Sequence, residues 1–319
     1  MIQRISYQHS PISSIKSLSE HLRVSEDVLV YIAENRDKYY QQNKPELKPD
    51  GKERITYRLD IELKKIQKQI KTRIFNKVNY PEYLQGSIKD KRNPRTYDRN
   101  AAIHAGSNFI ISEDVSDFFH SIDEKLVNDM WKYLFGFSVD VSELLTKLTT
   151  YNGYVPQGGV TSSYLSNLIL WDVEPALVEK LNKLNITYTR YIDDVTLSSK
   201  VDWLPEKNKI ESINSVFAML TGKGLKPNRT KHKIMGRNTK MVIHKLNVNS
   251  GRPTMNKKKR QKIRLEVYNL KKSATVCKRS GEPYKKLYQS VHGKVLELCN
   301  FHPTQGAQFI EELKQIAPV

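Results

Sequence analysis

Hydrophobic positions near the N-terminus recur mainly at helical spacing. Residues 17–40 contain two short amphipathic patterns, and Ser25 stands where the second pattern needs an N-cap. The pair fits either a small helical cap or a DNA-reading helix-turn-helix, and we prefer the cap. Residues 61–78 show the same helical spacing and leave a cationic outer face, with apolar positions at Leu63, Ile66, Ile70 and Ile74.

Later segments alternate between strand-like and helical patterns. Asp50-Gly51 lies between two extended segments and predicts the tip of a hairpin. Residues 124–150 are largely helical by periodicity, and the glycine-rich stretch that begins at Gly153 predicts a turn followed by one long helix. The pattern predicts three regions, a helical cap, a central catalytic region and a helical C-terminal lobe: residues 1–45, 46–250 and 251–319.

Charge sets this chain apart from an ordinary globular protein. It carries 53 Lys and Arg against 34 Asp and Glu, a formal net charge of +19, which favours a nucleic-acid partner over a purely solubilising role. No apolar run approaches the roughly 18 residues that span a bilayer, and the N-terminus lacks the apolar core of a signal peptide. Cys277 and Cys299 show no metal-ligand spacing. We expect a cytoplasmic protein without a membrane partner.

The segment TRYIDDVTLS places two adjacent carboxylates inside a strand-like run. Aspartate is depleted from strands, and neighbouring like charges repel, so a tight hairpin that projects Asp193 and Asp194 from its tip is predicted. A divalent cation would offset the repulsion, and Mg²⁺ prefers a few carboxylates together with phosphate oxygens.

A third carboxylate ends another strand-like run, FIISEDVSDFF, at Asp114. Two ions held by Asp114 and Asp193, with Asp194 nearby, would support nucleotidyl transfer by a two-metal mechanism. Each acid alone also fits an ordinary turn or strand end, so the prediction depends on the set.

Four segments in order, FIISEDVSDFF, VPQGGVTSSYLSNL, YIDD and GLKPNRTKHK, resemble successive motifs of reverse transcriptases. The chain most resembles the bacterial retron reverse transcriptases, whose signature before the first catalytic strand is similar to Asn100-Ala101-Ala102-Ile103-His104. The resemblance implies an α+β right-hand polymerase with fingers, palm and thumb. It assigns catalysis and the binding of two Mg²⁺ ions to the three aspartates, and adds Val115 to the metal site.

The same resemblance implies residues that contact the incoming deoxynucleotide. Phe119 would collide with a ribose 2′-hydroxyl, although a core aromatic is the alternative for it and more so for Phe118. The other implied nucleotide-binding residues, from the glycine-rich turn, the GLKPNRTKHK segment and the fingers hairpin, are Gln157, Gly158, Lys231, Lys52 and Arg54, with Lys89 or Arg92 as further candidates.

Residues expected to bind RNA lie in two places. Asn100 and His104 belong to the retron signature, where His104 either contacts nucleic acid or holds the loop. The basic run that opens the C-terminal lobe suits phosphate contacts and comprises Lys257, Lys258, Lys259, Arg260 and Arg264. Nearby tyrosines, including Tyr268, either stack on unpaired bases or package helices.

Two departures from the family pattern stand out. Ile192 occupies the position between Tyr and the Asp pair where Ala or Val is common, a conservative change. Residues 241–246 replace the retron Val-Thr-Gly signature, and only Val242 matches it. This second departure weakens the retron assignment more than it weakens the polymerase assignment.

A retron enzyme implies a structured noncoding RNA that serves as both template and primer. Synthesis would start from a 2′-hydroxyl and give branched RNA–DNA (msDNA), within an anti-phage system that includes a toxic effector protein. Two alternatives stay open: another bacterial defence-associated or intron-like reverse transcriptase, and a catalytically silent RNA-binding scaffold.

Overall fold

A computed structural model describes residues 4–47, 51, 53–90, 92–202, 204–276, 279 and 281–318. The chain packs as two units, Met1–Asn100 with Asn108–Ile234 and Ala101–Ser107 with Met235–Val319. These boundaries differ from the expected ones at residues 45 and 250. The N-terminal helices share a hydrophobic core with the central region, and the short strands before residue 256 pack with the C-terminal helices.

The two helices expected within residues 17–40 are present near the N-terminus. Leu18, Leu22 and Leu29 are fully buried against the core. Ser25 precedes the second helix in extended conformation, but its side chain makes no capping hydrogen bond, whereas the Ser14 hydroxyl accepts one from the Ser17 amide. The elements are β1 (Ser6–Tyr7), α1 (Ile15–Leu22), α2 (Glu26–Glu34), β2 (Tyr40–Gln42), β3 (Glu46–Leu47), β4 (Glu53–Arg54), β5 (Tyr57–Leu59), α3 (Ile61–Arg73), β6 (Val78–Asn79) and β7 (Leu84–Gln85).

The predicted hairpin near residue 50 is present, since β3 and β4 pair antiparallel, although Asp50 lies outside the described residues. The helix predicted over residues 61–78 ends at Arg73, because Val78 pairs with β1 instead.

Residues 97–236 lie mostly in the first unit, although residues 101–107 and 235–236 belong to the second. The elements are α4 (Tyr97–Ile103), β8 (Phe109–Ser116), α5 (Phe118–Ser121), α6 (Glu124–Asp129), α7 (Val139–Thr149), α8 (Ser162–Leu168), α9 (Glu174–Lys183), β9 (Thr187–Tyr191), β10 (Asp194–Ser199), α10 (Glu206–Gly222), β11 (Lys226–Pro227) and β12 (Lys233–Gly236). The prediction of one long helix after the glycine-rich turn is wrong. Pro175 lies in the first turn of α9, because proline is tolerated at a helix start and disrupts a helix interior.

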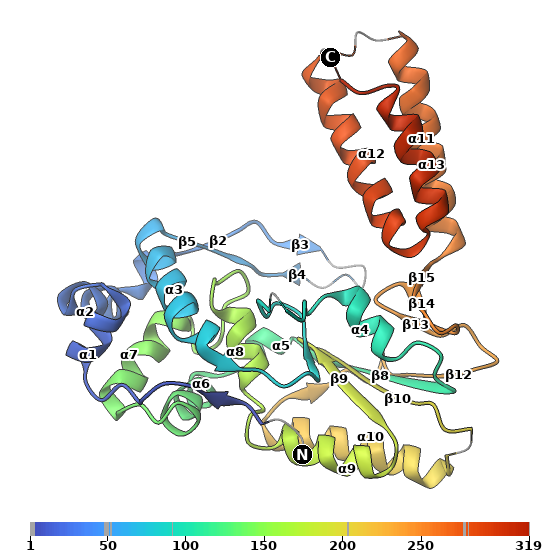
Figure 1. Cartoon of the computed structure of the whole chain (residues 1–319). Coiled ribbons are helices and arrows are strands. Elements are labelled where there is room, and N and C mark those ends of the chain that lie inside the picture. Colours follow the sequence, from blue (N-terminus) through green and yellow to red (C-terminus); the bar gives the residue numbers. More distant parts are fainter. Residues whose placement is uncertain are drawn as a thin grey trace. The chain divides into compact units, whose positions relative to one another are not determined.

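The central sheet has the strand order β11-β8-β10-β9-β7. Its pairings are antiparallel except that of β7, which runs parallel to β9. Helices α9 and α10 lie side by side along the sheet, and α9 contacts β9 (Figure 1). These helices cover one face of the sheet. Strand pairing brings the C-terminal ends of β8 and β9 and the N-terminal end of β10 together at one end of the sheet.

The second unit joins a small sheet to a helical bundle. Strands β13 (Val242–Ile243), β14 (Leu246–Asn247) and β15 (Thr254–Met255) pair antiparallel. Helices α11 (Lys257–Val276), α12 (Glu282–Phe301) and α13 (Pro303–Lys314) pack on one another. None of the helices in the described part of the chain combines the length and apolarity needed to cross a bilayer. The expected α+β fold class is confirmed.

Candidate active site

A tight hairpin between β9 and β10 carries the adjacent aspartates, as predicted. Tyr191 pairs with Asp194, so Ile192 and Asp193 form a two-residue turn. Ile192 has φ +60°, in the left-handed region that β-branched residues rarely adopt. Strained backbone of this kind persists only where its surroundings hold it in place.

Strand β8 brings the third carboxylate to the same point. Asp114 lies directly opposite Asp194 in the antiparallel ladder. Burial, followed by repulsion from Asp193 and Asp114, raises the pKa of Asp194 to about 7, and the protonated form donates a hydrogen bond to Asp114. Burial and the Asp114 charge also raise the pKa of Asp193. The carboxyls of Asp194 and Asp114 are thus close enough to share a proton.

Lys231 and Asn228 contact Asp114 from the segment after β11. The Lys231 ammonium lies 3.1 Å from both carboxylate oxygens, and the Asn228 amide donates to Oδ2 at 3.0 Å. Partial burial lowers the pKa of Lys231, but its hydrogen bond to Asp114 and the charge of that carboxylate outweigh burial and raise it. Lys231 was expected here from the sequence, whereas the direct contact of Asn228 with the carboxylate was not predicted.

Asp114 and Asp193 line a cavity of about 140 Å³ in the first unit, whereas Asp194 is not among its lining residues. Its lining brings together most of the residues expected to bind metal or nucleotide: Arg54, Asp114, Val115, Phe119, Gln157, Asp193 and Lys231. Lys52 lies outside the described residues. Within those described, no group of three or more His, Cys, Asp or Glu side chains is arranged to hold a metal ion. Mg²⁺ commonly takes one or two carboxylates and completes its shell with phosphate oxygens and water, which fits the paired Asp114 and Asp194.

Gly158 meets a steric requirement within the protein itself. Its φ is +111°, and a Cβ there would collide with the main-chain carbonyl of Tyr57. The Tyr57 amide also donates to the Gln157 carbonyl at 2.8 Å. The glycine therefore lets the turn pack against β5, and its predicted contact with nucleotide stays a prediction.

The residues expected to bind RNA have different surroundings. Asn100 and His104 are fully buried, and for His104 this favours the loop-holding alternative. Lys257, Lys258 and Arg264 are exposed on α11. The remaining two are partly engaged, Lys259 with Glu297 at 2.7 Å and Arg260 with Gln305 at 3.5 Å.

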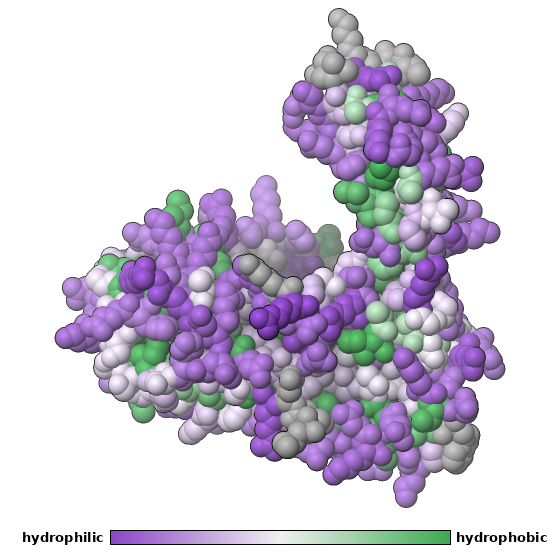
Figure 2. Space-filling model, in the orientation of Figure 1, coloured by the Kyte–Doolittle hydropathy of each residue, from purple (hydrophilic) through white to green (hydrophobic). Residues whose placement is uncertain are grey.

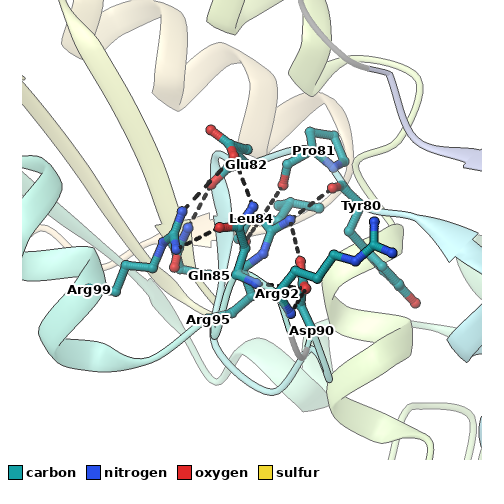
Figure 3. A network of polar contacts seen from close by, with 10 residues as sticks. Tyr80, Pro81, Glu82, Leu84, Gln85, Asp90, Arg92, Arg95 and Arg99 are labelled. Carbon is teal, nitrogen blue, oxygen red and sulfur yellow. Dashed lines mark hydrogen bonds and ion pairs between the residues drawn. The ribbon is translucent and has the colours of Figure 1, made fainter.

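Arg95 organises the loop that contains Lys89 and Arg92 (Figure 3). Its guanidinium donates to the carbonyls of Pro81, Leu84 and Tyr80 at 2.6, 2.9 and 3.1 Å. Lys89 and Arg92 line a separate cavity of about 430 Å³ beside Arg95 and not the aspartate cavity. These hydrogen bonds hold β7 in place, and Gln85 of β7 pairs with Tyr191 beside the turn between β9 and β10.

Arg190 supports the same hairpin from inside the core. Its guanidinium and the Glu174 carboxylate are completely buried and form two hydrogen bonds, of 2.6 and 2.8 Å. Its other donors reach the carbonyls of Ser166, Asn167 and Ile192, each at 3.0 Å. Burial lowers the pKa of Arg190, but the Glu174 charge outweighs it and raises the pKa. The pairing of Arg190 with Glu174 was not predicted. The sequence feature that could have indicated it is an arginine within a strand whose other positions are expected to be buried.

The chain is similar to known reverse transcriptases. Residues 46–273 match the family described as reverse transcriptase (RNA-dependent DNA polymerase). The chain is 34% identical to the Retron Se72 reverse transcriptase of Salmonella heidelberg, over 98% of this chain and 82% of that protein. It is 29% identical to the Retron Ec48 reverse transcriptase of Escherichia coli, over 98% and 78% respectively. Apo telomerase from Candida tropicalis aligns with a TM-score of 0.47 and 9% identity, over 98% of this chain and 65% of that one.

Proposed function

Because the chain belongs to the retron reverse transcriptases and is an RNA-directed DNA polymerase, we propose that it copies a cognate structured noncoding RNA into DNA at Asp114, Asp193 and Asp194. Its fold is the α+β right-hand polymerase fold of that family. The observation that carries the proposal is the pairing of Asp114 with Asp194 beside the strained Ile192-Asp193 turn.

The three aspartates and the main chain at Val115 would hold two Mg²⁺ ions, which when bound supply charge stabilisation for the attacking and leaving oxygens. The raised pKa of Asp194 supports this assignment, because clustered buried acids gain stability from a cation. Asp114 orients the site through its hydrogen bonds to Asn228 and Lys231. Lys231 would neutralise charge on the leaving pyrophosphate.

Residues around the cavity would hold the incoming deoxynucleotide. Phe119 would exclude the ribose 2′-hydroxyl, because an aromatic ring under the sugar leaves no room for another oxygen. Arg54 would bind the triphosphate and Gln157 would contact the sugar or base. The support for these roles is that all three side chains line the cavity beside Asp114.

The noncoding RNA would provide both template and primer, with synthesis starting from a 2′-hydroxyl and yielding msDNA. The enzyme would act in the cytoplasm, where deoxynucleotides are available, as part of an anti-phage system with an effector protein. Similarity to retron reverse transcriptases along 98% of the chain supports this part of the proposal.

The test recovers nucleic acid bound to the protein from cells that carry its flanking DNA. Wild type is compared with Asp193→Asn/Asp194→Asn and with Asp140→Asn, which changes an exposed acid on α7. We expect one discrete DNA, joined to RNA through a debranching-sensitive linkage, in wild type and Asp140→Asn but not in the double variant.

Other outcomes would redirect the proposal. Unbranched DNA that disappears in the double variant would retain the polymerase and contradict 2′-hydroxyl priming. Bound RNA without DNA in any sample would favour the scaffold alternative. Phage plating on cells that carry the locus, with wild type or the double variant, tests the defence role, which requires that protection be lost with synthesis.

A further inference from the structure

A groove in the second unit lies between α11 and α13, in a part of the chain that holds none of the three aspartates. Its cavity is about 270 Å³. Eight residues line it: Arg264, Val267, Tyr268, Lys271, Gln305, Gln308, Phe309 and Glu312. This volume lies just below the range of about 300–1,000 Å³ typical of sites for drug-sized ligands, so the groove suits a smaller group.

Apolar side chains form the floor of the groove, and polar and aromatic side chains surround that floor. Val267 and Phe309 are buried and form the floor, whereas Tyr268 is 62% exposed. In the described part of the chain, the side chains of Arg264, Tyr268 and Gln308 make no hydrogen bond, ion pair or ring contact. The Tyr268 ring, the Gln308 amide and the Arg264 guanidinium are therefore available to bind a ligand in the groove.

Only one of the cations at the groove is neutralised within the protein. Lys271 donates to Glu312 at 3.0 Å, which leaves the Arg264 charge for a ligand. Residues 235–319 contain 18 Lys and Arg against 5 Glu and no Asp, an excess of 13 of the chain's +19. Hydrophilic residues cover most of the visible face of this helical bundle (Figure 2). Such a surface attracts a polyanion.

We infer that this groove binds one unpaired nucleotide of an RNA, with the base stacked on Tyr268. The Gln308 amide can both donate to and accept from a base edge, and Arg264 can pair with the adjoining phosphate. A nucleotide within a duplex has both base faces covered by its neighbours, so the site selects a loop, bulge or end. This inference rests on the proposed function, in which an RNA is the partner.

Binding is tested with two fluorescent RNAs of equal length. One is a hairpin with a loop of randomised sequence, and the other is a fully paired blunt duplex. The variants are Tyr268→Ala, Tyr268→Phe and Arg264→Ala. The matched control is Tyr133→Ala, which removes a tyrosine of similar exposure, 69%, from the first unit.

Stacking of a base on an aromatic side chain contributes about 1–3 kcal/mol by alanine substitution, so Tyr268→Ala should weaken hairpin binding about 5- to 150-fold. Tyr268→Phe should stay close to wild type because the ring is kept. Duplex affinity should not change in any Tyr268 variant or in Tyr133→Ala. Arg264→Ala should weaken hairpin binding and lower its dependence on salt concentration. Photo-crosslinking of 5-bromouridine in the loop should label Tyr268 in the wild-type protein.

Three results would overturn the inference. Equal losses for hairpin and duplex would show only general electrostatic binding. Unchanged hairpin affinity in Tyr268→Ala and Arg264→Ala would leave the groove to a protein partner. Crosslinks confined to other residues would place the loop elsewhere. DNA synthesis on a generic primed RNA template separates this from the proposed function: if the groove inference alone fails, synthesis persists, and if the proposed function fails, wild type makes no DNA.

Discussion

Replacing Glu174 with glutamine removes the only carboxylate paired with the buried Arg190 guanidinium among the described residues. The side chain keeps nearly the same volume, so packing changes little and the effect is mainly electrostatic. Arg190 would keep its three main-chain acceptors but lose its counter-charge. One of these acceptors is the Ile192 carbonyl in the catalytic turn, so the substitution should affect both stability and activity.

The expected magnitude follows from complete burial of both partners. Removing one member of a buried ion pair costs about 3–5 kcal/mol, because the other charge stays buried without compensation. The control is Glu179→Gln on the same helix, where Glu179 pairs with Lys183 at 3.6 Å and both side chains are more than half exposed. An exposed pair of this spacing contributes only about 0.3–0.5 kcal/mol.

Urea unfolding monitored by tryptophan fluorescence measures the change. All three tryptophans, Trp131, Trp171 and Trp203, fall within residues 108–234, so the signal reports the first unit. DNA synthesis is measured below the unfolding midpoint, where the variant is still folded. We expect a loss of about 3–5 kcal/mol and reduced synthesis for Glu174→Gln, and neither for Glu179→Gln.

Equal stability of Glu174→Gln and Glu179→Gln would refute the reasoning, because it would mean that the buried charge finds another partner or water. A large loss of stability with unchanged synthesis by the folded protein would retain the energetic argument and contradict support of the turn by Arg190.

Three further predictions follow from the same geometry. Gly158→Ala should destabilise the first unit by about 1–3 kcal/mol more than Gly153→Ala in urea unfolding, because a Cβ at Gly158 meets the Tyr57 main chain and one at Gly153 meets open space; equal losses would contradict the steric argument. Asp194→Asn should abolish synthesis and, at pH 8 without added metal, raise the midpoint of thermal unfolding. The pKa of Asp194 is raised in the folded state, so its ionised carboxylate destabilises the folded protein above pH 7, and this penalty vanishes toward pH 3.8. A lower midpoint in the variant would contradict the prediction. The Mg²⁺ concentration for half-maximal synthesis should rise as pH falls from 8 to 6, because protons compete for a carboxyl with a pKa of about 7; a constant requirement would remove Asp194 as the titrating ligand.

The sequence by itself indicated the polymerase family and the carboxylates proposed for its chemistry. Adjacent carboxylates in a strand-like run are unfavourable without a cation, so a hairpin at this point followed from local propensity and charge repulsion. Asp193 lies in its turn, whereas Asp194 begins β10. Helical periodicity likewise placed Leu63, Ile66 and Ile70 among the buried positions of α3. Ordered motifs predicted the polymerase family, which the comparison confirmed.

Tertiary structure decided which distant residues meet. Strand pairing put Asp114 opposite Asp194, and a segment more than one hundred residues after Asp114 supplied Asn228 to the same carboxylate. The partnership of Arg190 with Glu174 depends on how α9 packs against β9, which no local pattern specifies. Hydrophobic periodicity records which residues are buried but not the long-range contacts that bury them. The supports of the catalytic turn and the groove beside Tyr268 therefore emerge only from the packed chain.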